Sequence, residues 1–308
     1  MDKDKLKNKK EFFPVVLMAS LFVIIHSLAL LVTEPFVKAG VQPAFENPDD
    51  PFNIIYIFVI LLVFTLIILL IAKFWKKKVI QVIILGAIGY TAAYLFYPLL
   101  TLIIPDALSV ILAIVFAILL VYTLYKYPEW YVIDMSGIII GAGAIAIFGM
   151  SLGVLLVIVF LIALAIYDAI SVYKTKHMID LADTVMDLKL PVLLVIPKIR
   201  HYSLLKETKR LKEQIKEGEE RDAFFMGLGD IVMPGILVAA TYNYIPDGLP
   251  IALSVMAGTL IGFAFLMIFV MRGKPQAGLP LLCGGAIAGY IISSLILFGE
   301  LKGLTFSF

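Results

Sequence analysis

Long apolar runs separated by short polar connections make up most of the chain. An α-helix needs about 20 apolar residues to cross a bilayer, and the runs have about that length. The pattern predicts an all-α polytopic membrane protein with nine transmembrane helices. They are expected at residues 12–33, 53–73, 79–104, 107–125, 131–149, 152–174, 223–242, 250–271 and 277–299.

One longer polar segment, residues 175–222, divides the chain into membrane parts at 1–174 and 223–308. Within it, residues 188–197 read LKLPVLLVIP, which is too short to span and rich in residues that favour extended structure. This piece is expected to be an interfacial anchor, or an extended edge that occupies the substrate site or pairs with substrate. Residues 202–217 have a helical pattern, and the segment as a whole is expected to be partly disordered.

Composition supports a membrane protein and limits the cofactors. Of the 308 residues, 62% are hydrophobic, against about 45–50% in soluble domains. A single cysteine, Cys283, excludes an intramolecular disulfide and a zinc cluster built on several thiolates. The three histidines are scattered, so we predict neither a metal nor a cofactor.

Charges at the ends of the runs predict the orientation, because cytoplasmic connections carry an excess of lysine and arginine. Alternate connections are basic, and those between them are mainly acidic. The N-terminus is therefore predicted in the cytoplasm and the C-terminus outside. The basic positions are Lys3, Lys5, Lys7, Lys9, Lys10, Lys73, Lys76, Lys77, Lys78, Lys126, Arg272 and Lys274, and the acidic ones Glu34, Glu46, Asp49, Asp50, Asp106 and Asp247.

Two aspartates lie in consecutive apolar runs, Asp168 in the sixth and Asp230 in the seventh. A carboxylate in the hydrocarbon region costs several kcal/mol by most estimates, so such residues usually have a function. Counted from the predicted cytoplasmic ends at Lys174 and Ala223, the two lie about 9 and about 10 Å deep at 1.5 Å per residue. We expect their carboxyls at the same depth on adjacent antiparallel helices.

Two neighbouring carboxyls can share a proton, since both cannot ionise cheaply. One can then activate water while the other protonates a peptide carbonyl, without metal or covalent intermediate. The titrations would be coupled, so neither role is assigned to one residue. Buried acids also mark ion paths, which leaves a cation or proton transporter or leak channel as the alternative, and a non-catalytic scaffold as a third. The sequence lacks the repeated half of many transporters.

The neighbours of the aspartates complete two motifs. Gly227 and Gly229 remove bulk beside Asp230, and Tyr167 places a phenol next to Asp168. Tyr167-Asp168 and Gly227-Leu228-Gly229-Asp230 resemble the YD and GxGD signatures of the presenilin and signal peptide peptidase family of intramembrane aspartyl proteases. The similarity is greatest to archaeal presenilin homologues and covers the whole length. It implies an aspartic endopeptidase that cleaves transmembrane helices with Asp168 and Asp230.

A third family motif, Pro-Ala-Leu at the start of the ninth span, is altered here. The matching positions read Ala277-Gly278-Leu279, followed by Pro280. The resemblance implies that this stretch lies near the aspartates. Gly278 and Pro280 would loosen the helix start and leave backbone groups free, which could pair with an unwound substrate by strand addition.

The resemblance also implies the partners. The predicted orientation is that of presenilins and opposite to that of signal peptide peptidases, which implies substrates that cross with the N-terminus outside. No further subunit is implied, and a homo-oligomer stays open. Basic segments beside the spans are explained by topology and lipid headgroups, so no nucleic-acid partner is expected. The protein is expected to be a multi-pass component of a prokaryotic, archaeal cell membrane.

Other polar residues in the runs have simpler interpretations. Asp134 lies near the predicted cytoplasmic end of the fifth run, so its side chain is expected to reach the interface rather than to act in a site. His26 is expected to hydrogen-bond to a neighbour. Gly137, Gly141 and Gly143 predict close helix packing rather than a phosphate loop, because no strand precedes them.

Overall fold

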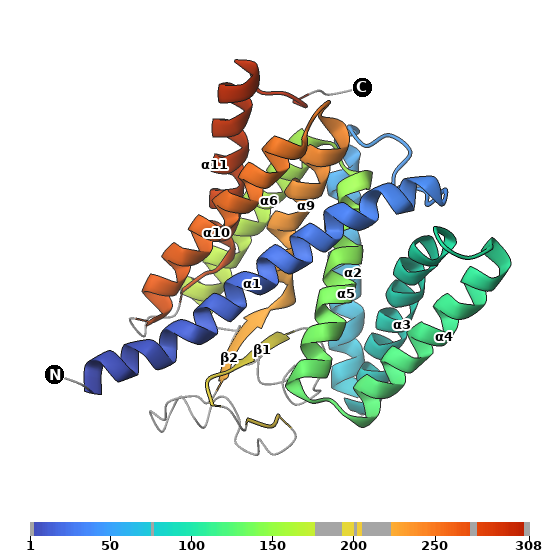
Figure 1. Ribbon diagram of the computed structural model, residues 1–308, viewed down its shortest axis with the longest axis horizontal. Coiled ribbons are helices and arrows are strands. Elements are labelled where there is room, and N and C mark those ends of the chain that lie inside the picture. Colours follow the sequence, from blue (N-terminus) through green and yellow to red (C-terminus); the bar gives the residue numbers. More distant parts are fainter. Residues whose placement is uncertain are drawn as a thin grey trace.

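A computed structural model describes residues 3–74, 77–175, 193–199, 202–204, 223–271 and 276–304. Nine α-helices lie in these ranges and follow the nine predicted runs in order (Figure 1). A π-helical turn, η1 (Ser171–Thr175), continues the sixth of them. The helices are α1 (Lys3–Lys38), α2 (Phe52–Phe74), α3 (Lys77–Thr101), α4 (Asp106–Lys126), α5 (Trp130–Ser151), α6 (Val154–Ile170), α9 (Leu228–Tyr244), α10 (Leu249–Met271) and α11 (Leu279–Phe298).

The predicted fold class, an all-α polytopic membrane protein, is confirmed. In the described ranges, seven helices are long and apolar enough to cross a membrane: α1, α3, α4, α5, α6, α10 and α11. The helix α9 has 17 residues, somewhat fewer than the roughly 20 that a perpendicular crossing needs. The count of nine crossings and the orientation remain predictions.

The predicted seventh span is wrong at its start. Residues Ala223–Gly227 form a strand, β2, and the helix begins only at Leu228. The strand pairs antiparallel with β1 (Leu193–Pro197), with Val195 opposite Phe225. A partner strand from a distant segment satisfies this backbone, and the aromatic pair inside β2 suits a strand.

The segment before the seventh helix is described only in part. The extended structure expected over 188–197 is confirmed at Leu193–Pro197, while residues 188–192 lie outside the described ranges. The helix expected over 202–217 also falls outside them, apart from residues 202–204.

The helix α9 lies at the centre of the bundle. It contacts α1, α5, α6, α10 and α11, and ten of its residues from Ile231 to Thr241 are buried. The long helix α1 crosses α5 and α9 obliquely, with the α3–α4 hairpin on one side and the α10–α11 pair on the other (Figure 1). The residues that follow the strand β2 are thus placed in the middle of the molecule.

The helices α10 and α11 touch through their backbones. A Cβ built on Gly258 of α10 would collide with the carbonyl oxygen of Gly285 on α11, and the reverse also holds. The same is true of Gly262 against the carbonyl of Leu281. Small residues allow such close packing in membranes, where van der Waals contact is a main source of helix association.

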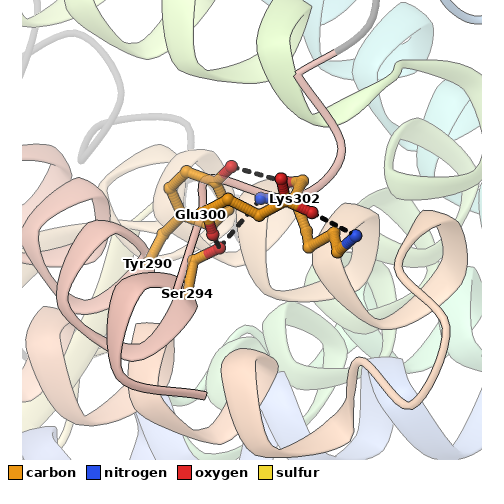
Figure 2. A network of polar contacts seen from close by, with 4 residues as sticks. All are labelled: Tyr290, Ser294, Glu300 and Lys302. Carbon is orange, nitrogen blue, oxygen red and sulfur yellow. Dashed lines mark hydrogen bonds and ion pairs between the residues drawn. The ribbon is translucent and has the colours of Figure 1, made fainter. Parts of the chain in front are cut away.

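The end of α11 is closed by the chain that follows it. Gly299 has a left-handed backbone (φ 73°), and its N–H donates to the Leu295 carbonyl, a common helix end. The buried Tyr290 hydroxyl donates to the Lys302 carbonyl at 2.6 Å. The buried Ser294 hydroxyl donates to the Glu300 carbonyl at 2.8 Å and accepts the Lys302 N–H at 2.9 Å (Figure 2). These bonds fold residues 299–302 back onto α11.

The backbone contact between α10 and α11 predicts the effect of a single methyl group. Gly258→Ala should lower the free energy of unfolding by about 1–3 kcal/mol, because an overpacked backbone contact must open. Gly284→Ala on α11 is the matched control, since nothing lies within 4 Å of its Cβ position. Thermal unfolding of the purified variants in detergent measures the difference, and equal stability of the two variants would contradict this packing.

Candidate active site

Asp168 lies at the end of α6 and is bound by the start of another helix. Its side chain is 5% exposed, and its Oδ2 accepts the Leu279 N–H at 3.0 Å. Leu279 is the first residue of α11, and the N-cap residue Gly278 has no side chain to cap that helix. A helix N-terminus carries unsatisfied N–H groups and partial positive charge. The Asp168 carboxylate therefore supplies, from another span, the acceptor that α11 lacks.

Asp230 lies in the first turn of α9, directly after β2. It is half-buried and surrounded by backbone: a Cβ on Gly227 would lie 3.4 Å from its Oδ2, and one on Gly278 would lie 3.5 Å from the same atom. Asp230 is thus placed by the strand β2 and the first turn of α9. The depth counted from Ala223 along a single helix does not describe this path.

The dipeptide Gly278-Leu279 lies beside both carboxyls. The Leu279 N–H binds Asp168, while Gly278 lies against Asp230. The preceding Ala277 is buried, and Pro280 occupies the first turn of α11. The structure therefore brings the altered third motif to the aspartates, as the resemblance implies.

A cavity of about 180 Å³ adjoins Asp230. The strand β2 forms one wall with Phe224, Phe225, Met226 and Gly227, and Gly278 and Gln276 border Asp230. The opposite walls are apolar and come from α1 and α10, with Pro14, Val15, Met18, Leu266, Met267 and Val270. An extended strand and a carboxyl thus line the same cavity.

Three other residues of the predicted motifs lie away from the aspartates. The Tyr167 side chain is 70% exposed, because adjacent helical residues point about 100° apart. Gly229 is exposed, with open space at its Cβ position. Leu228 packs on α5, where a Cβ on Gly141 would lie 3.2 Å from Leu228 Cδ1. Of the two motif glycines before Asp230, it is Gly227 that contacts the carboxyl.

Two residues near the site were not included in the motifs. The buried His26 Nε2 lies 2.9 Å from the Ile231 carbonyl, next to Asp230, which confirms the expected hydrogen bond to a neighbour. Cys283 is fully buried on α11. Its position one turn after Leu279 is a signal that could have placed it near the site.

The expectation that Asp134 reaches the membrane interface is wrong. Its side chain is 6% exposed, and Oδ1 accepts the Val195 N–H at 2.8 Å. The strand β1 packs on α5 at this point and covers the carboxylate. The predicted helix packing is confirmed for Gly141, which faces Ile25 of α1, and for Gly143, which faces Leu95 of α3, whereas Gly137 faces Leu194 of the strand β1.

Comparison with known proteins identifies the family. A family model described as signal-peptide peptidase, presenilin aspartyl protease matches residues 19–299. The chain belongs to this family. No curated protein matches the chain. Membership of this family makes the protein a multi-pass membrane enzyme. It gives no support to the alternative of a transporter or channel.

Two solved structures of a presenilin family intramembrane aspartate protease resemble this member of the family. The one in the C222 crystal form is 31% identical, with a TM-score of 0.67, over 92% of this chain and 99% of the other. The one in the P2 form is 33% identical, with a TM-score of 0.68, over 91% and 96%. The likeness extends over nearly the whole of each chain.

The space beside Gly278 predicts a graded response to substitution in this presenilin-family enzyme. In Gly278→Ala the new methyl would lie in ordinary contact, 3.5 Å from Asp230 Oδ2, so most activity should remain. In Gly278→Val the added methyl groups should displace the carboxyl and lower kcat on the order of tenfold or more. Cleavage of a single-span substrate by reconstituted protein measures both, and an inactive but folded alanine variant would refute this geometry.

Proposed function

We propose that this enzyme hydrolyses peptide bonds within transmembrane helices, with Asp168 and Asp230 as its catalytic pair. The observation that supports the pair most directly is the shared contact with Gly278-Leu279. One carboxyl accepts the Leu279 N–H, and the other lies against Gly278. Two carboxyls from α6 and α9 are thus held on one short segment of α11.

The pair would work as one acid–base unit. One proton is shared by the two carboxyls, since like charges in a poorly solvated site resist double ionisation. One carboxylate removes a proton from water, whose oxygen attacks the scissile carbonyl carbon, while the other carboxyl protonates the carbonyl oxygen. Collapse of the tetrahedral intermediate breaks the C–N bond. The amine leaves with the proton of one carboxyl, and a hydroxyl of the intermediate returns a proton to the other carboxylate, which restores the singly protonated pair. No covalent intermediate is needed.

The strand β2 offers an edge on which an unwound substrate could bind. The Val195 N–H donates to Asp134 and not to β2, so Val195 and Phe225 form a non-hydrogen-bonded pair. In such a pair the Phe225 N–H and carbonyl also point away from the partner strand. The strand β2 also lines the cavity beside Asp230. Strand addition there would extend a substrate backbone toward the carboxyls.

The predicted topology completes the proposal. Both aspartates then lie in the cytoplasmic half of the bilayer of a prokaryotic cell, so water enters from that side. Substrates are membrane proteins that cross with the N-terminus outside and enter laterally between spans. A helical amide is shielded by its own backbone, so unwinding precedes hydrolysis and turnover is slow. One chain carries both carboxyls, so hydrolysis needs no second copy.

Removal of either carboxyl should abolish cleavage. Asp168→Ala and Asp230→Ala are each expected to lower the rate at least about a hundredfold, because acid–base catalysis needs both groups. The protein is reconstituted with a labelled single-span substrate oriented N-terminus outside, and products are identified by mass spectrometry. Asp106→Ala is the matched control, an exposed acid at the start of α4, and should leave the rate unchanged.

The outcomes of this experiment separate the alternatives. If the parent and Asp106→Ala form product and neither Asp168→Ala nor Asp230→Ala does, the result supports Asp168 and Asp230 as the catalytic pair. Cleavage that survives either Asp168→Ala or Asp230→Ala in folded protein rules out this mechanism.

The backbone donor of Phe225 can be tested apart from its side chain. Phe225→Pro removes the outward N–H, and proline is tolerated where a strand N–H faces away from its partner. We expect a raised KM relative to Phe225→Ala, which loses the ring and keeps the N–H. Steady-state cleavage of the single-span substrate gives the comparison. Equal KM values for the two variants would argue against strand addition at β2.

A further inference from the structure

A third buried acid holds the sheet that leads to Asp230. Asp134 lies in the second turn of α5 and is almost fully buried. Its Oδ1 accepts the N–H of Val195, the middle residue of β1, at 2.8 Å and across 61 positions in the sequence. Asp134 does not line the cavity beside Asp230, so any effect on the reaction must pass through the sheet.

The face of α5 that carries Asp134 is shaped to the sheet and to the segment after it. Positions 134, 137 and 141 share one helix face. A Cβ on Gly137 would lie 2.7 Å from Leu194 Cδ2, and one on Gly141 would lie 3.2 Å from Leu228 Cδ1. One face of α5 therefore contacts β1 and the residue between the two glycines before Asp230.

A second carboxylate, just before α5, holds the chain that leaves β1. Glu129 Oε1 accepts the Ser203 hydroxyl at 2.6 Å, and Oε2 accepts the Leu204 N–H at 3.0 Å. With Asp134, this holds Val195 and residues 203–204 to the start of α5. In these three hydrogen bonds, backbone N–H groups and the Ser203 hydroxyl donate to the carboxylates of Asp134 and Glu129. They therefore hold the backbone of Val195 and Leu204 in place in addition to apolar packing.

We propose that Asp134 is a positioning residue for the reaction, and this proposal rests on the proposed function. By accepting the outward N–H of Val195, it fixes the position and register of β1 on α5. Because β1 pairs with β2 from Leu193 to Pro197, the same bond sets where β2 ends and where α9 begins with the turn that carries Asp230. Without that acceptor, a buried N–H loses its partner, and a short strand pair can slip in register.

The test compares the loss of the acceptor with its conservative replacement. Asp134→Ala removes the acceptor, whereas Asp134→Asn keeps an oxygen for the Val195 N–H and removes the charge. We expect Asp134→Ala to lower kcat between about tenfold and a hundredfold, as for a misplaced catalytic group, and to add products cut at neighbouring bonds. Asp134→Asn should restore kcat and the parental cleavage site.

Two further variants complete the design. Ser136→Ala is the matched control, a buried residue of the same helix whose hydroxyl donates to the Val132 carbonyl. Val195→Pro removes the donor and leaves Asp134 in place. It should reproduce the loss of kcat, and the double variant with Asp134→Ala should lose less than the product of the two single effects, because both act on one bond. Val195→Pro keeps the proposal testable if Asp134→Ala does not fold.

Hydrogen exchange over residues 193–197, followed by mass spectrometry, tests the contact without catalysis. Exchange should rise in Asp134→Ala and stay at the parental rate in Asp134→Asn and Ser136→Ala. Parental exchange and kcat in Asp134→Ala would overturn the proposal, as would an asparagine variant as impaired as the alanine one. A parent that cleaves no substrate would instead count against the proposed function, while the exchange result still decides whether Asp134 holds β1.

Discussion

The interior of a membrane supplies no hydrogen bonds, so a carboxylate placed there needs polar partners from the protein itself. Asp168 finds one in the N–H of Leu279, where α11 begins without a side-chain cap. Asp230 lies in the first turn of α9, where the helix dipole also favours negative charge. The Asp168 side chain thus binds the N-terminus of α11, and Asp230 lies in the N-terminal turn of α9, so α6, α9 and α11 meet at one place.

This requirement explains features far from the carboxyls. If α11 moved along its axis, the Leu279 N–H would leave Asp168. Backbone contact at Gly258 and Gly285 fixes α11 against α10. At the other end of α11, the bonds from Tyr290 and Ser294 to the returning chain close the helix. Glycines and a C-terminal turn that touch neither aspartate therefore help to keep them together.

The sequence predicted the helices and the two aspartates because both signals are local. Apolar runs of about 20 residues are visible in one window, and an acid inside such a run is conspicuous. The strand at Ala223–Gly227 was read as helix, since its partner lies some thirty residues earlier. Asp134 was read as an interfacial acid for the same reason, because its donor lies 61 positions away. The pattern of apolar residues carries no information about hydrogen bonds between segments that are far apart in the sequence.

The two edges of the β1–β2 sheet differ in a way that bears on substrate binding. The outer edge of β1 is closed, because α5 covers it and Asp134 takes the Val195 N–H. The strand β2, by contrast, lines the cavity beside Asp230. An exposed strand edge recruits another strand, so closing one edge leaves a single direction in which the sheet can grow. Under the proposed function, an extended peptide that adds at β2 would run beside the residues that lead into Asp230, whereas β1, bound by Asp134 on α5, would not accept it.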